Sequence, residues 1–316
     1  MHGLTTIDPK DLNLAPFLIQ IEGKDAKDFL HRLSTANIKN LSIQNGVPGC
    51  FLNATGKLMG SFFCWRTGDH TYTLEGLDSI QGHSFRQSIL QWLDQMTFSE
   101  SLTVTDLTST QRCLWELSDA TNAELTLREW QCSANPSGSL TTRASDTFLG
   151  RAWSTIWGSV TDLQPLISQT THSTEILAAL SSARIQSGFA FPERELTSSS
   201  NPLELGMTAW IAENKGCYPG QEVIERIISQ GSPAKRLVRL EMSAPTPPSS
   251  PLTLSLLEPS GHKEVGKLTS AADNLALALV GKVFAKTGVT LLLSQSEPTK
   301  PPIECKVTSV VEWQTP

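Results

Sequence analysis

The sequence lacks any long apolar run. No segment of the 316 residues approaches the roughly 20 consecutive apolar residues that a membrane-spanning helix needs. The mean hydropathy of −0.14 is that of a soluble chain. The N-terminal segment 1–8 has neither a basic stretch followed by an apolar core nor an arginine-rich pattern, so we expect no signal or transit peptide. These absences predict a protein with no membrane location.

Metal-binding and disulfide patterns are also missing. The six cysteines are scattered and form no C-x-x-C pair, and they lie at positions 50, 64, 113, 132, 217 and 305. None of the six histidines stands at ligand spacing from a cysteine or from another histidine. A zinc finger or a self-contained cluster site is therefore not expected, and no metal ligands are assigned. Scattered cysteines in a long chain without a leader favour a reducing cytoplasm.

Neither a basic face nor a known catalytic motif is visible. The net charge is −6 and the acidic residues are not bunched, which disfavours direct, broad nucleic-acid binding but leaves a local basic pocket open. The chain contains no G-x-S-x-G, H-E-x-x-H, P-loop or G-x-G-x-x-G sequence. No nucleophile–base pair can be assigned from these patterns alone.

The pattern of short strands and few helices predicts an α+β protein with mixed or antiparallel sheets. Helical periodicity predicts helices over 25–33, 79–96 and 173–186, and another directly behind residue 220. Alternating or β-branched runs separated by turn residues predict the strands 15–22, 49–53, 58–65, 71–75, 102–106, 112–117, 125–130 and 148–153. After a boundary near 235, five further strand-like runs between prolines and turns predict a small C-terminal β-barrel.

The most informative segment is Lys215–Glu222, K-G-C-Y-P-G-Q-E. Gly216 and Gly220 allow a tight turn that offers the thiol of Cys217. If residues 215–217 are extended, Lys215 lies on the same side as Cys217. An ammonium group and the helix N-terminus behind the turn would both favour the thiolate. A buried, inert cysteine in a glycine-rich turn explains the pattern equally well.

This segment resembles the K-G-C-Y-x-G-Q-E signature of the YgfZ family, folate-binding proteins related to the T-protein, the aminomethyltransferase of glycine cleavage. Other family-like stretches are 23–30, 51–58, 183–188 (A-R-I-Q-S-G), 201–206 (N-P-L-E-L-G) and 231–237. The resemblance runs from about residue 15 to 240 and fades beyond it.

The resemblance implies a three-domain, T-protein-like architecture. Residues 1–50 and 141–234 would form a discontinuous folate-binding domain that carries the signature, 51–140 a second α+β domain, and 235–316 the barrel. Tetrahydrofolate or a derivative would bind where the three domains meet. The family's role implies an accessory factor in iron–sulfur cluster assembly or repair that supports tRNA modification. Its partners would be folate and iron–sulfur enzymes or assembly proteins, and we expect a monomer.

The resemblance also assigns residues. Cys217 would be the working thiol and Lys215 would tune it. Relatives read the pterin with a glutamate where this chain has Gln186, so Glu204 is a substitute candidate. The remaining assignments to folate binding are Arg184 and Arg226 for the ligand's anionic tail, and Tyr218, Gln221 and Glu222 of the signature. For each arginine, a structural ion pair with a nearby carboxylate such as Glu222 or Glu225 is the competing interpretation.

The acidic pair of the T-protein, in G-x-x-x-D-D, is absent. The corresponding stretch 56–63 has Gly60 and Ser61 and no carboxylate, so acid–base help from this position is impossible. We therefore expect no aminomethyltransferase activity. Two alternatives remain: a tetrahydrofolate-dependent aminomethyl- or methyltransferase, and a folate-binding module without chemistry.

Overall fold

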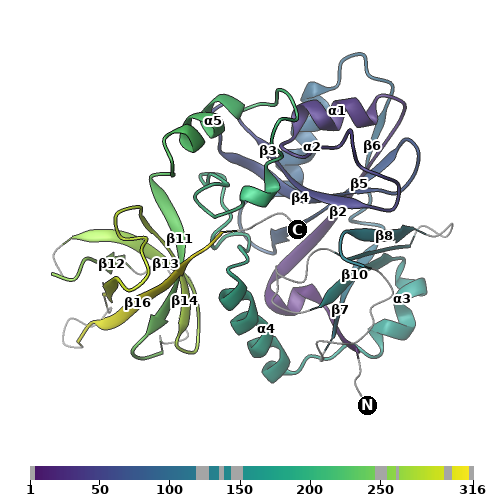
Figure 1. Cartoon of the computed structure of the whole chain (residues 1–316). Helices are drawn as coiled ribbons and strands as arrows, with labels where there is room; N and C mark the ends of the chain where they lie inside the picture. Colours follow the sequence, from purple (N-terminus) through teal and green to yellow (C-terminus); the bar gives the residue numbers. More distant parts are fainter. Residues whose placement is uncertain are drawn as a thin grey trace.

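The computed structural model describes residues 4–118, 128–134, 139–143, 152–245, 255–260, 263–294 and 301–312. Within these residues the chain forms two five-stranded sheets and a closed six-stranded barrel, with few helices. Figure 1 shows the barrel to one side of the two sheets, with α4 and α5 near the junction. The named strands pair antiparallel throughout. The predicted α+β class with a C-terminal barrel is confirmed.

The first sheet has the order β3-β4-β5-β2-β6. Its strands are β2 (Leu14–Glu22), β3 (Gly46–Leu52), β4 (Leu58–Arg66), β5 (Thr71–Ser79) and β6 (Thr103–Asp106). Helices α1 (Ala26–Leu33) and α2 (Phe85–Met96) lie on this sheet (Figure 1). The helical spacing of Phe29, Leu30 and Leu33 puts all three in the core, where they are at most 2% exposed.

The second sheet has the order β1-β7-β10-β9-β8. It is built from β1 (Leu4–Ile7), β7 (Arg112–Ser118), β8 (Gln131–Ala134), β9 (Leu140–Arg143) and β10 (Trp153–Gly158). A 3₁₀ turn, Pro9–Leu12, connects β1 to the first sheet, and α3 (Val160–Ile167) packs on β7 and β10.

Strand pairing crosses both domain boundaries that the sequence analysis places in the first half. β3 pairs with β4 across residue 50, and β10 pairs with β7 across residue 140. The sheets therefore group residues 14–106 in one unit and β1 with β7–β10 in the other. Pairing partners are set by non-local backbone hydrogen bonds, which a pattern along the chain does not reveal.

A buried carboxylate joins the two sheets. Glu75 of β5 is 5% exposed and accepts hydrogen bonds from the indole N–H of Trp65 and of Trp157, each at 2.9 Å. The hydroxyl of Thr142 on β9 donates to the same carboxylate at 2.7 Å. Because every donor comes from a buried side chain, this network holds β4 and β5 against β9 and β10.

The second half of the chain leads from the sheets to the barrel. Helix α4 (Thr174–Ser187) ends at Gly188, whose φ of 81° is the left-handed conformation typical of helix ends. The chain then passes through a 3₁₀ turn, Thr208–Trp210, and α5 (Gln221–Ser229). The barrel has the order β11-β14-β13-β12-β15-β16 and consists of β11 (Lys235–Met242), β12 (Ser255–Leu257), β13 (Glu264–Ala272), β14 (Leu275–Gly281), β15 (Thr290–Leu293) and β16 (Ile303–Val310).

The barrel begins at Lys235, where the composition of the sequence changes. The predicted helix 79–96 starts only at Phe85, because β5 runs on to Ser79 and Ser84 caps the helix by accepting from Gln87 N–H. The predicted strands 125–130 and 148–153 lie largely outside the described residues, and residues 128–130 form no strand. No helix in the described ranges is long and apolar enough to cross a membrane.

Candidate functional site

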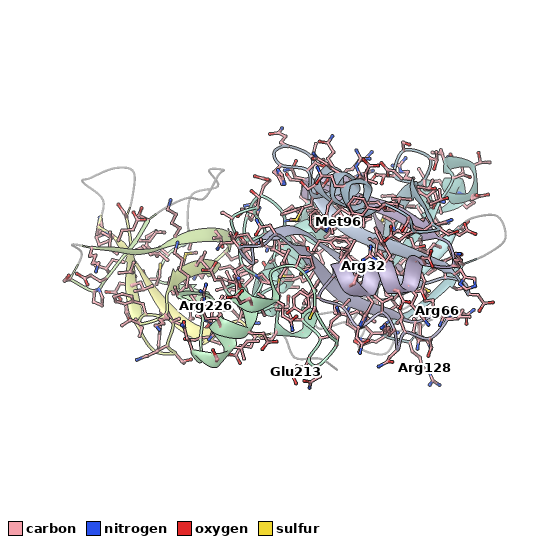
Figure 2. The ribbon with its side chains drawn as sticks, turned by 90° about the horizontal axis from the view of Figure 1, so that it is seen from above. Arg32, Arg66, Met96, Arg128, Glu213 and Arg226 are labelled. Atoms are coloured by element: carbon pink, nitrogen blue, oxygen red, sulfur yellow. The ribbon has the colours of Figure 1, made fainter. Side chains whose placement is uncertain are left out.

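The K-G-C-Y segment offers one exposed thiol between two buried anchors. Lys215 is 8% exposed and Tyr218 is 7% exposed, whereas Gly216 and Cys217 between them face solvent. In Figure 2 Glu213 projects from the rim of the molecule and Arg226 lies on α5, so both flanks of this loop are at the surface. The anchors hold the ends of the loop and leave its middle accessible.

Lys215 is anchored to the C-terminal end of α1. Its ammonium group donates to the carbonyl oxygens of His31 and Ser34, the latter at 2.7 Å. These carbonyls belong to the last turn of the helix, where backbone acceptors lack partners and a positive charge is favoured. The ammonium group also lies 5.0 Å from the ring centre of Tyr218, within cation–π range. Helix α1 therefore positions the loop that carries Cys217.

The environment of Lys215 favours its neutral form more than water does. Burial, and next the charge of Lys39, lower the pKa of Lys215 to about 8, while the thiolate form of Cys217 acts in the opposite direction. Burial likewise raises the pKa of Tyr218 to about 12, with a further contribution from Glu225. Lys215 and Cys217 are thus coupled electrostatically.

The backbone of the loop differs from the extended form considered in the sequence analysis. Gly216 has a φ of 98°, so Lys215 and Cys217 do not alternate along a strand. Lys215 turns inward to α1 and Cys217 is exposed, because the positive φ of Gly216 between them lies outside the extended range. The predicted same-side arrangement is therefore wrong for this loop.

Cys217 is exposed, whereas the other five cysteines are buried. Burial raises the pKa of Cys132 and of Cys305 to about 12. It also raises the pKa of the thiols of Cys50, Cys64 and Cys113. Cys217 is therefore the cysteine that solvent reaches in the folded protein.

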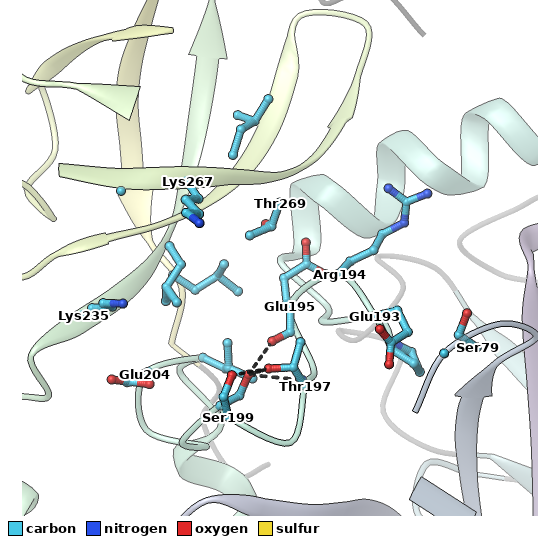
Figure 3. Close-up of a pocket in the computed structure, with 18 of the residues that line it drawn as sticks. Ser79, Glu193, Arg194, Glu195, Thr197, Ser199, Glu204, Lys235, Lys267 and Thr269 are labelled. Carbon is cyan, nitrogen blue, oxygen red and sulfur yellow. Dashed lines mark hydrogen bonds between the residues drawn. The ribbon is translucent and has the colours of Figure 1, made fainter. Parts of the chain in front are cut away.

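A large cavity lies where the first sheet, the loop 192–200 and the barrel meet. Its volume is about 950 Å³, within the roughly 300–1,000 Å³ typical of small-molecule sites. Residues from the end of β5, from the loop and from β11, β13 and β14 line it, and Figure 3 shows them around the opening. The junction of three parts is where the sequence analysis places the folate cavity.

Charged side chains of both signs line this pocket. Lys57 and Glu204 form an ion pair at 3.7 Å. The side chains of Arg194, Lys235 and Lys267 have no hydrogen bond or ion pair within the described part of the chain. Unpaired cations at a cavity wall are available to an anionic ligand.

Of the residues assigned to folate binding, the structure brings only Glu204 to the pocket wall. Gln186 is exposed near the end of α4, and Glu222 and Arg226 are exposed on α5. Gln221 begins α5 and donates to Glu225 at 3.5 Å. Tyr218 is an anchor of the thiol loop, as described above. The assigned residues therefore fall into two groups, one at the thiol loop and one at the pocket.

Arg184 is a structural residue behind the pocket. It is 4% exposed and donates to Glu195 at 3.1 Å and to the carbonyl of Phe189 at 2.8 Å. Glu195 also accepts from Ser270 of the barrel, at 2.6 Å. The ion pair that the sequence analysis weighs for Arg184 exists, but its partner is Glu195, which a pattern of nearby residues could not identify.

The turn 53–57 connects the thiol loop to the pocket. A Cβ on Gly220 would lie 2.6 Å from the carbonyl oxygen of Asn53, and one on Gly56 would lie 2.9 Å from Val223 of α5. On its other side the turn is held by Asn201, which donates to the carbonyl of Gly56 at 2.8 Å, and it continues into Lys57 at the pocket. Close packing on both sides links α5 to the pocket wall.

The position of the missing acidic pair is closed. A Cβ on Gly60 would lie 2.5 Å from Ile89 of α2. Ser61 faces a second cavity of only about 20 Å³, which also touches Glu75. That space holds about one water molecule, and both oxygens of Glu75 already accept hydrogen bonds. No acid–base group is free here.

Comparison with known proteins places this geometry in context. Residues 235–285 match the family model of the CAF17 C-terminal beta-barrel domain. Aminomethyltransferase T of the glycine cleavage system from Bartonella henselae superposes with a TM-score of 0.80, covering 98% of this chain and 86% of that chain at 16% identity. The fold is that of aminomethyltransferase T.

Two relatives match this chain in sequence. A candidate chloroplastic transferase of Arabidopsis thaliana, At1g60990, is 26% identical over 299 residues, which cover 88% of this chain and 66% of that protein. An aminomethyltransferase of Acidobacterium capsulatum is 30% identical over 66 residues, 21% of this chain and 18% of that enzyme. The chain thus spans just under two thirds of the plant relative and a small part of the bacterial one.

Several pocket residues escaped the sequence analysis. The sequence pattern indicates only a polar loop before the signature for Glu193, Glu195 and the serines that follow, and only a strand for Lys267. The available signal was the concentration of polar side chains in one connecting segment, since binding residues often lie on such loops. The described residues contain no group of three or more His, Cys, Asp or Glu side chains that could hold a metal ion.

Proposed function

We propose that this protein is a folate-binding accessory factor in iron–sulfur cluster assembly or repair that supports tRNA modification, with Cys217 as its working thiol. The observation that carries this proposal is the contrast between one exposed thiol on an anchored loop and five buried ones. A scaffold that shields its other thiols and holds this one at the surface favours chemistry with a partner protein over internal packing.

The pocket supports the folate part of the proposal. A reduced folate has a ring edge rich in donors and acceptors and a tail of carboxylates, and the pocket offers carboxylates, hydroxyls and unpaired cations. Tetrahydrofolate or a derivative would lie against Glu204, Lys57 and the loop 192–200. When bound, the folate would supply one-carbon chemistry, and the residues of this chain would orient it.

The proposal is tested by complementation of a strain that lacks this family's function. Cys217→Ser should fold normally and fail to restore the activity of iron–sulfur enzymes and tRNA methylthiolation. Glu213→Gln, an exposed change in the same loop, is the matched control and should restore both. Calorimetry with a reduced monoglutamyl folate tests the ligand separately. Rescue by Cys217→Ser would favour a folate-binding module without chemistry.

The second candidate is a tetrahydrofolate-dependent aminomethyl- or methyltransferase, and it is favoured by the fold and by the named activities of the relatives. The closed cavity beside Ser61 and the fully engaged Glu75 count against it. The purified protein, given tetrahydrofolate and an aminomethyl-loaded carrier, should release no more ammonia than a reaction without enzyme. Turnover approaching that of a genuine aminomethyltransferase, run in parallel, would reverse the choice.

A further inference from the structure

The large pocket has two chemically different ends. In Figure 3, Lys235, Lys267 and Glu204 lie on one side of the view, and Glu193 and Ser79 lie on the opposite side. The first end has an excess of cations, because Lys57 also belongs to it through its ion pair with Glu204. The second end carries the carboxylate of Glu193 and the hydroxyl of Ser79, together with the single cation Arg194 (Figure 3). A ligand that fills the pocket must match this difference along its length.

The first end, here called the lysine end after Lys57, Lys235 and Lys267, can accept more than one negative charge of a ligand. Lys235 and Lys267 stand on the barrel strands β11 and β13, their side chains are exposed, and neither has an ionic partner in the described ranges. Two carboxylates line the pocket beside these lysines: Glu204 is already shared with Lys57, and Glu264 of β13 accepts a hydrogen bond from Ser255 at 2.6 Å. Two ammonium groups on a rigid wall therefore remain for anionic groups of a ligand.

The opposite end is organised around Glu193. This residue has a φ of 58°, a conformation that side chains other than glycine rarely adopt. One of its carboxylate oxygens accepts from the backbone N–H of His83 at 2.9 Å, and the other has no hydrogen-bond partner within the described residues. Gly82 lets the side chain pass, since a Cβ there would lie 2.6 Å from the carboxyl carbon of Glu193. A residue with a strained backbone, whose carboxylate lines a cavity and keeps one oxygen without a hydrogen-bond partner, is typical of a binding position.

We propose that the pocket binds a folate in one direction, with the donor-rich edge of the pterin on Glu193 and a poly-γ-glutamate tail on Lys235 and Lys267. This inference rests on the folate binding proposed above and adds the form of the ligand. Glu193 takes the role of the pterin-reading carboxylate, which Gln186 cannot take because it does not line the pocket. Each added γ-glutamyl unit brings one carboxylate to the lysine wall.

The test is calorimetry of 5-formyltetrahydrofolate in its monoglutamyl and triglutamyl forms. The unmodified protein should bind the triglutamyl form roughly tenfold more tightly, as two partly exposed ion pairs would allow. The double variant Lys235→Ala/Lys267→Ala should bind both forms with nearly equal affinity. Lys286→Ala, an exposed barrel lysine outside the pocket, should keep the preference. Both lysines are exposed, so the double variant should fold, which circular dichroism checks.

Glu193→Gln tests the other end. This change should weaken the binding of both folate forms by the same factor, on the order of tenfold, and leave the ratio of the two affinities unchanged. Inorganic tripolyphosphate serves as a probe of charge alone and should bind more weakly than the triglutamyl folate.

The possible failures are distinguishable. Equal binding of both folates by the unmodified protein, or a preference that survives the double variant, overturns the proposed direction while the folate-binding function stands. Tripolyphosphate binding as tight as that of the triglutamyl folate also overturns it, in favour of a phosphate ligand. Absence of binding by every folate removes both the inference and the folate part of the proposed function.

Discussion

His31 and Lys215, which are 184 positions apart, hold each other by two hydrogen bonds in opposite directions. The ring Nε2 of His31 lies 2.7 Å from the carbonyl oxygen of Lys215, and the ammonium group of Lys215 donates to the carbonyl of His31. Because a carbonyl only accepts, Nε2 carries the proton. The other ring nitrogen, Nδ1, is buried without a partner in the described structure. This reciprocal link fixes the thiol loop to α1 and makes it sensitive to pH.

The first prediction concerns acid. Burial lowers the pKa of His31 below its ordinary value of 6.5, because protonation would place an unpartnered N–H in the interior. The contribution of His31 to stability is full above pH 6.5 and is lost as the pH falls through the lowered pKa. Denaturant unfolding should show the unmodified protein losing stability relative to His31→Gln as the pH falls from neutrality. His70→Gln, at an exposed site, should show no such change.

The second prediction concerns alkali. The unfolded chain keeps the Lys215 proton up to a pKa of 10.5, whereas the folded chain loses it near pH 8. The contribution of Lys215 to stability is therefore full above pH 10.5 and is lost as the pH falls through about 8. Between these values the unmodified protein should gain stability with rising pH relative to Lys215→Met. If the difference in unfolding free energy between the two proteins did not change with pH, the burial of the charge would be contradicted. Lys286→Met, at an exposed lysine, is the control.

The two glycines of the signature should respond differently to alanine. Gly216 and Gly220 have φ values of 98° and 80°, where an L-residue is strained by about 1–2 kcal/mol. A Cβ on Gly216 meets nothing within 4 Å, whereas one on Gly220 would lie 2.6 Å from Asn53 O. Gly216→Ala should therefore lower the free energy of unfolding only by this strain. Gly220→Ala should lower it by at least about twice as much. If denaturant unfolding showed equal losses of unfolding free energy for the two variants, the turn 53–57 would have to shift at little cost to admit the Cβ.

Thiol labelling should distinguish Cys217 from the other cysteines. In native protein, iodoacetamide should add rapidly to one thiol per chain, because the other five are buried and burial raises their pKa. Intact mass measurement should show that Cys217→Ser removes this rapid addition, and that the remaining thiols react after unfolding. A second thiol that reacts at the native rate of Cys217 would contradict the burial pattern.

The direction in which Glu204→Gln changes folate affinity tests the role of Glu204. If Glu204 read the pterin, as the sequence analysis considers, Glu204→Gln would loosen folate binding. At the lysine end it opposes the anionic tail, so Glu204→Gln should release Lys57 and tighten triglutamyl folate by roughly threefold. Gln186→Glu should leave the affinity unchanged, since Gln186 does not line the pocket. Calorimetry measures both, and loosening by Glu204→Gln would restore the pterin-reading role.

Local patterns predicted the parts of the fold whose physics is local. The 3.6-residue spacing of Phe29, Leu30 and Leu33 predicts α1, and turn-separated strands after Lys235 predict the barrel. The K-G-C-Y segment likewise marks its own importance, because glycines around a thiol indicate an unusual turn. The missing carboxylates at Gly60 and Ser61 are visible in the sequence as well.

Relationships between distant residues were decided only by the tertiary structure. The inward turn of Lys215 depends on free carbonyls at the end of α1, and the partner of Arg184 depends on the path of the loop 192–200. The sheets join strands across the expected boundaries at 50 and 140, since hydrogen bonds between strands carry no mark in either strand alone. The pocket exists only where the barrel meets the first sheet, so its lysines and Glu193 acquire a common role through folding. The sequence by itself determined the thiol and its turn, and the fold determined what the thiol is coupled to.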